Sequence, residues 1–308
     1  MAEILKISEY PESQEMYMIA GWRQWADAGS VSSGLPRYLA QSMNARLIGI
    51  IPPDDFYLFQ IPATHDLVRP FVRFEDGYPE TLETPRNEFY FAGDKDRGLI
   101  IFIGDEPHMN VERYTKALLD AAERFHVRRI VTLGGVYGEL PYNRARSISA
   151  IVSLKHLRDE IAGLAVELSE YQGGASIGSY LCHRAGQRGM ACVGFYAFVP
   201  TYDFTEIEAL GSGIRIENDF MAWLGIMRRV NHMLKLNFDL AELRRRSEEL
   251  IDVMDAKVDE LDKSVPEIRI RDYFAQLAEN FKEVTFDPLA DVWEEELRRL
   301  FDEDEGGQ

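Results

Sequence analysis

Short, continuous apolar runs, most of them followed by a turn and a helical pattern, restrict the fold of this 308-residue chain more than any other feature. The runs are Met16–Trp22, Leu99–Ile103, Arg129–Leu133 and Met190–Val199. The first leads to a helical stretch at about Val31–Met43, and the second to one at Val111–Phe125. Strands without polar alternation are typical of sheets buried on both faces. The pattern therefore predicts an α/β fold whose mainly parallel sheet is covered by helices on both sides.

The segment 46–93 has a different sequence pattern, because its short extended pieces are interrupted by proline and glycine. These pieces are Arg46–Ile51, Phe56–Phe59, Phe71–Phe74 and Glu88–Phe91. Such punctuation favours turns between short strands. We expect added antiparallel strands or a hairpin excursion here.

From Asn237 onward the pattern becomes purely helical, and an apolar stripe runs along one helical face until Pro266. The stripe consists of Leu240, Leu243, Leu250, Met254, Val258, Leu261 and Val265. A second helix carries Phe274, Leu277 and Phe281, a third begins at Asp287-Pro288, and the tail from Asp302 is acidic. We predict an α/β body over 1–236 and a helical extension over 237–308. The stripe must be buried against that body, against another subunit, or against both.

Charge and composition exclude several classes of function. With 34 basic and 52 acidic residues the formal charge is −18, which disfavours nucleic-acid binding because phosphate contacts need clustered lysine and arginine. The apolar runs are too short to span a membrane, and the start resembles no signal peptide. Two cysteines and six scattered histidines give neither a disulfide framework nor metal-ligand spacing. We expect a cytoplasmic protein with no metal, no cofactor and no membrane association.

Three glycine-containing segments are the candidates for a binding site. The first holds Gly21, Trp22, Asp27, Ala28 and Gly29; the second holds Gly134, Gly135, Arg144 and Arg146; the third holds Gly173, Gly174 and Gly178. Each follows or precedes a strand end or a helix start, where backbone N–H groups are available to a ligand. The first three apolar strands and the glycine-rich loop would bring these segments to one cleft at the carboxyl edge of the sheet, lined by Trp22. Glu106 is a further candidate beside it.

Each segment also has a purely structural interpretation. Asp27 is of a type that caps helices, paired glycines form turns, and the arginines could be ordinary surface residues. Cys182 and His183 point about 100° apart on one helix, so they form no dyad, and Cys182 is expected to be a small buried residue. Because the familiar catalytic motifs are missing from the sequence, we assign no catalytic residue.

Taken in order, these segments resemble the proteasome assembly chaperone 2 family in its prokaryotic branch. The similarity rests on Gly21-Trp22 with Asp27-Ala28-Gly29, on Gly104-Asp105-Glu106-Pro107, on Val131 to Gly135 with Pro141 and Arg144, on Gly173 to Gly178, and on Val199-Pro200 with Tyr202. It covers residues 15–235, and the helical extension is also similar to that of longer bacterial members. Tyr142 stands where the family often has histidine.

The resemblance implies a three-layer α/β/α body akin to the purine nucleoside phosphorylase fold, self-association, and no established enzymatic activity. Relatives that assemble proteasomes suggest proteasome subunits as partners, but this chain ends Gly306-Gly307-Gln308 and not in a hydrophobic–tyrosine–any docking tripeptide. Our leading hypothesis is a non-enzymatic homo-oligomeric scaffold, with a trimer as the best guess. The alternative is an enzyme acting on a small molecule with a nucleoside or carboxylate group, bound in the predicted cleft.

Overall fold

A mixed β-sheet with helices on both faces forms the body of the protein. The computed structural model describes residues 4–60, 69–202 and 214–287. Nine strands run across the sheet in the order β1-β3-β6-β7-β2-β8-β11-β9-β10, and β12 pairs with β11. Their bounds are β1 Lys6–Ile7, β2 Glu15–Arg23, β3 Arg46–Ile50, β6 Asn87–Gly93, β7 Arg97–Asp105, β8 Val127–Gly138, β9 Ile148–Val152, β10 Glu167–Leu168, β11 Cys192–Tyr202 and β12 Ile214–Arg215.

The four central strands, β7, β2, β8 and β11, are parallel to one another. β2, β7 and β8 contain the first three apolar runs expected from the sequence, and β11 contains the fourth except for its first two residues, Met190 and Ala191. Because helices cover both faces of the sheet, the side chains that point to either face are buried, as in β7. The expectation of a mainly parallel sheet holds for this centre only. Antiparallel strands flank it, with β6 on β7 at one side and β9 on β11 at the other.

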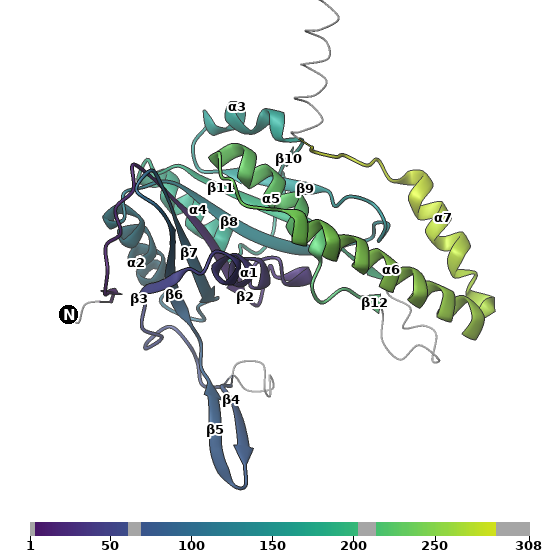
Figure 1. The fold of residues 1–308 in the computed structure, drawn as a ribbon, viewed down its shortest axis with the longest axis horizontal. Helices are drawn as coiled ribbons and strands as arrows, with labels where there is room; N and C mark the ends of the chain where they lie inside the picture. The colour runs from purple at the N-terminus through teal and green to yellow at the C-terminus, as the bar shows by residue number, and fades with distance from the viewer. Residues whose placement is uncertain (1–3, 61–68, 203–213, 288–308) are drawn as a thin grey trace, which may run out of the picture.

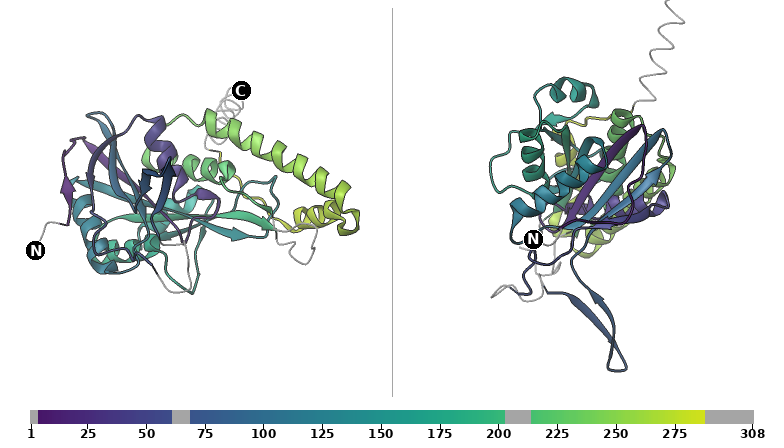
Figure 2. Two further views of the ribbon diagram at one scale, coloured as in Figure 1. Left: turned by 90° about the horizontal axis from the view of Figure 1, so that it is seen from below. Right: turned by 90° about the vertical axis from the view of Figure 1, so that its left-hand side faces the viewer.

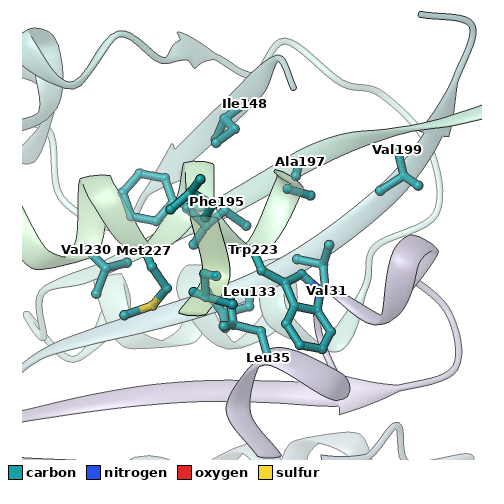
Figure 3. Packing of buried hydrophobic residues seen from close by; sticks show 14 of the residues in the cluster. Val31, Leu35, Leu133, Ile148, Phe195, Ala197, Val199, Trp223, Met227 and Val230 are labelled. Carbon is teal, nitrogen blue, oxygen red and sulfur yellow. The ribbon is translucent and has the colours of Figure 1, made fainter. Parts of the chain in front are cut away.

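Two helices cover each face of the sheet (Figure 1). On one face lie α2 (Val111–Arg124) and α4 (Ile177–Gln187), and on the other lie α1 (Gly34–Ser42) and α5 (Phe220–Leu234). Figure 3 shows the second face, where Trp223 and Met227 of α5 pack over Phe195 and Leu133 of the sheet. Shorter helical turns are α3 (Leu157–Ile161) and the 3-10 segments Ala28–Ser30, Ala162–Leu164 and Pro266–Ile268.

A two-stranded hairpin, β4 (Phe71–Glu75) and β5 (Tyr78–Glu83), projects from the body between β3 and β6 (Figures 1 and 2). The hairpin excursion expected in 46–93 is therefore present. The prediction of an extended piece at Phe56–Phe59 is wrong. Phe56 lies in a turn in which its N–H donates to the carbonyl of Pro53. Its ring is buried against Tyr114, 5.3 Å between centroids.

The C-terminal helices α6 (Ala241–Ser264) and α7 (Ile270–Asn280) pack on their own chain. Leu243, Met254 and Val258 of the stripe are buried and the other four are half-buried, so the body and α7 cover much of it. Phe274 of α7 contacts the ring of Tyr202 at 4.8 Å between centroids. The boundary near residue 236 lies between α5 and α6 and stays a prediction, while the third helix from 288 and the acidic tail lie outside the described residues. None of the described helices is long and apolar enough to cross a bilayer.

Candidate functional site

The loops that follow β2 and β8 meet at the carboxyl ends of these parallel strands. Asp27 and Gly135 form an isolated parallel bridge, and the N–H of Gly135 donates to the carbonyl of Ala26 at 2.9 Å. Beside this bridge is a cleft of about 560 Å³, which also receives Gly174 from the glycine-rich loop before α4. The structure thus brings the three candidate segments together at one edge of the sheet.

Aromatic side chains form much of the cleft wall. Trp25 is 70% exposed, Tyr171 is 71% exposed, and Tyr137 is half exposed. Tyr196 and Phe198 of β11 also line the cleft, and the Tyr196 hydroxyl bonds to the Ser176 Oγ at 3.0 Å. The sequence reasoning missed all five residues. Trp25 lies beyond the end of the buried strand, and Tyr171 stands two residues before the glycine pair Gly173-Gly174, so both positions carried a signal of exposure.

Trp22 does not line this cleft, and the prediction that it does is wrong. Its side chain is only 3% exposed, and its indole N–H donates to the Tyr114 hydroxyl at 3.0 Å. That hydroxyl donates to the Asn87 side-chain carbonyl at 2.8 Å. Trp22 is still within β2, where both faces are buried, and the first exposed tryptophan comes three residues later.

Asp27 holds the start of α1. Its Oδ1 accepts the N–H groups of Ser32 at 3.0 Å and of Ser33 at 2.8 Å. Burial raises the pKa of this carboxyl above its ordinary value, and the hydrogen bonds to Ser33 and Ser32 oppose the rise. Asp27 lines the cleft, but this carboxylate oxygen already satisfies two backbone donors.

Glu106 binds a backbone N–H group at the helix start that the sequence analysis considered available to a ligand. Its Oε1 accepts the N–H of Ile177, the first residue of α4, at 2.9 Å, and its Oε2 accepts the N–H of Trp25 at 3.2 Å. Burial raises the pKa of this carboxyl, while these two backbone bonds lower it. The positive end of α4 is therefore neutralised by the chain's own carboxylate.

The two arginines do not converge on the cleft. Arg146 is fully buried, and its Nε lies 2.7 Å from the Asp219 Oδ2. Its Nη1 donates to backbone carbonyls, including that of Tyr142 at 2.8 Å. Arg144 is half exposed and lies 3.4 Å from Glu283, and neither arginine lines the cleft.

The remaining glycines serve close packing around the cleft. A Cβ on Gly135 would lie 2.1 Å from the carbonyl oxygen of Ala28, so the second strand–loop junction needs glycine there. Gly29 has a φ of 59°, in the left-handed region that favours glycine. Gly21 lies under the carbonyl of Ser32, Gly134 under the ring of Tyr196, Gly173 beside the ring of Tyr171, and Gly178 beside Thr132.

Metal chemistry finds no support in this part of the molecule. Among the described residues no group of three or more histidine, cysteine, aspartate or glutamate side chains is placed to hold an ion. Cys182 and Cys192 are both buried and free, and the Cys182 thiol points at the Cys192 carbonyl oxygen at 3.7 Å. Cys182 is thus the small buried residue that the sequence predicted.

Comparison with known proteins gives one family and a set of similar structures. The model of the PAC2 family matches residues 22–258, which is more than half of the chain. No curated protein matches.

Three solved structures illustrate the likeness. The proteasome-assembly chaperone homologue Rv2125 of Mycobacterium tuberculosis has a TM-score of 0.67 at 22% identity, covering 78% of this chain and 94% of its own. Rv2714 of the same organism, a protein of unknown function, has a TM-score of 0.69 at 20% identity, covering 99% and 92%. PbaB of Pyrococcus furiosus, an archaeal proteasome activator, has a TM-score of 0.56 at 20% identity, covering 82% and 97%. At these identities the structures share the fold.

Proposed function

Because this chain belongs to the PAC2 family, we propose that it is a non-enzymatic, self-associating scaffold that binds other polypeptides. The printed names of two similar structures, a proteasome-assembly chaperone homologue and a proteasome activator, support a role in protein assembly. Proteasome subunits are accordingly candidate partners. The proposal includes a homo-oligomer, specifically a trimer, and a cytoplasmic location. It also includes a three-layer body akin to the purine nucleoside phosphorylase fold.

The observation that carries the proposal is how the charged side chains at the site are used. Asp27 and Glu106 accept backbone N–H groups, and Arg146 is paired with Asp219 inside the body. What the cleft leaves exposed is aromatic, chiefly Trp25 and Tyr171. Exposed aromatic side chains of this kind are typical of protein interfaces, where they supply apolar contact area.

The enzyme alternative has less support in this geometry. Phosphorolysis or carboxylate activation needs basic groups that converge on an anion and a free acid or base beside them. Arg144 and Arg146 lie outside the cleft lining, and Asp27 is the single ionisable carboxylate within it among the described residues. A cleft with aromatic walls and one carboxylate does not favour an anionic substrate.

The proposal is tested by affinity purification of the full chain from its native host, with mass spectrometry of the proteins and small molecules that it carries. A matched sample carries Trp25→Ala and Tyr171→Ala, which change exposed cleft residues only. We expect partner proteins at a constant ratio with the wild type and at a lower ratio with the variant. A bound small molecule, present at one per chain and converted on incubation, would contradict a non-enzymatic role.

A further inference from the structure

We propose that the β4–β5 hairpin of one copy docks on the aromatic cleft of a second copy, so that the chains associate head to tail. This inference rests on the self-association proposed above and names the two surfaces that make the contact. The surfaces are the apolar face of the hairpin, formed by Val72, Phe74 and Leu82, and the exposed cleft residues Trp25, Tyr137 and Tyr171.

The hairpin has an apolar face that the described residues of its own chain leave uncovered. Val72 pairs directly with Leu82 across the strands, and Phe74 lies two residues further along the same face. Phe74 is 61% exposed and Leu82 is 63% exposed. The opposite face is mixed, because the ion pair of Arg73 and Glu80 at 3.2 Å lies there beside the exposed rings of Phe71 and Tyr78.

Such a hairpin gains little stability by itself. An isolated pair of strands is marginally stable in water, and it becomes stable when its apolar face packs on another surface. The views in Figure 1 and in the right panel of Figure 2 agree that the hairpin points away from the body. All residues from Phe71 to Glu80 are exposed, as is Leu82, so the described part of the body does not cover this face. A clustered, exposed apolar face indicates a binding surface.

The cleft is a suitable acceptor because it is hollow, aromatic and nearly uncharged. Its volume of about 560 Å³ lies in the usual range for a binding pocket. Asp27 is its single ionisable carboxylate among the described residues, and the apolar face of the hairpin carries no charge. A chain of charge −18 repels its copies, so contact is favoured where both surfaces lack charge.

The topology places donor and acceptor on the same edge of the sheet but apart from each other. Asn87, the first residue of β6, pairs with Gly104 near the end of β7, so the hairpin leaves from the carboxyl edge. The cleft lies on the other side of β7, at β2, β8 and β11. Strands of five and six residues reach about 17–20 Å, enough to cross a subunit boundary. Because donor and acceptor are different patches, the contact is heterologous and can close a ring.

Mixing two complementary variants tests the proposal. One variant carries Phe74→Ser and Leu82→Ser in the hairpin, and the other carries Trp25→Ala and Tyr171→Ala in the cleft. All four side chains are exposed, so the folded body is retained. The control is Phe71→Ser, which removes an equally exposed ring from the opposite face of the same hairpin. Light scattering coupled to size exclusion measures the masses of the full-length proteins.

We expect each double variant to have the 35.3 kDa mass of one chain, and the control to keep the wild-type mass. An equal mixture of the two variants should rise above either alone, toward twice 35.3 kDa, because one intact hairpin then meets one intact cleft. Variants that keep the wild-type mass would overturn the assignment of these surfaces. A mixture that stays monomeric would also overturn it, since hairpin–hairpin pairing or closure on the chain's own cleft gives no rescue. A monomeric wild type would overturn the proposed self-association itself.

Discussion

Replacing Arg146 with methionine separates a structural arginine from a ligand-binding one. In the structure the Arg146 Nε lies 2.7 Å from the Asp219 Oδ2, and both side chains are fully buried. Asp219 also accepts the Ala222 N–H at 3.0 Å, which caps α5. Removing the guanidinium leaves the buried Asp219 carboxylate without the counter-charge that Arg146 supplies.

We expect Arg146→Met to lower the free energy of unfolding by about 3–5 kcal/mol, the usual effect of breaking a buried ion pair. In a protein of this size that is a fall in Tm on the order of 10 °C. Arg144→Met is the matched control, because Arg144 is half exposed and its pair with Glu283 is a surface contact. Its loss should change the free energy of unfolding by no more than about 1 kcal/mol.

The assay is urea unfolding followed by circular dichroism at neutral pH, on both single variants, on Asp219→Asn and on the double variant Arg146→Met/Asp219→Asn. Because the double variant removes both buried charges, its loss should be smaller than the sum of the single losses. Equal stability of Arg146→Met and Arg144→Met would refute the reasoning. Strict additivity in the double variant would refute it as well.

Three further predictions follow from the site. Burial raises the pKa of Glu106 in the folded state, so the folded protein keeps the Glu106 proton to higher pH than the unfolded chain does. The stability of the wild type should therefore fall relative to that of Glu106→Gln as pH rises above about 4.3, the ordinary pKa of a glutamate. Urea midpoints of the two proteins that change in parallel with pH, or in the opposite sense, would contradict this. Gly135→Ala should lower the free energy of unfolding by about 1–3 kcal/mol, because the added Cβ would clash with the Ala28 carbonyl oxygen. Gly163→Ala is the control and should not lower it, because no atom lies within 4 Å of the added Cβ. Equal Tm values for the two variants would contradict this prediction. Tyr114→Phe removes the hydroxyl that accepts the buried indole N–H of Trp22, and it should lower the free energy of unfolding by about 1–3 kcal/mol. Thermal denaturation measures this loss, and an unchanged Tm would contradict it.

The positions of the central strands were predictable, because a strand that is buried on both faces of a sheet has a continuous run of apolar residues. Leu99–Ile103 and Arg129–Leu133 accordingly lie inside β7 and β8. The short extended pieces interrupted by proline and glycine in 46–93 predicted added antiparallel strands. They did not predict which strands these would pair with. Which strand adds to which edge depends on contacts distant in sequence, as in the pairing of β6 with β7.

The candidate site was predictable in place but not in its chemistry. Glycines at strand ends located the edge of the sheet, and Gly135 and Gly174 lie on the cleft. Local sequence did not show that Glu106 bonds to the start of α4, 71 residues away, or that Arg146 bonds to Asp219, 73 residues away. A charged residue near a loop looks the same in sequence whether it faces solvent or a distant backbone group.

Self-association is the central claim, and the mass of the full-length chain in solution tests it most directly. Light scattering coupled to size exclusion, at physiological salt and micromolar concentration, should give a single species at a multiple of the 35.3 kDa chain mass, and the proposed trimer would have three times that mass. The self-repulsion of a chain with charge −18 makes added salt favour the assembly. A single species at 35.3 kDa, unchanged by salt, would contradict the account.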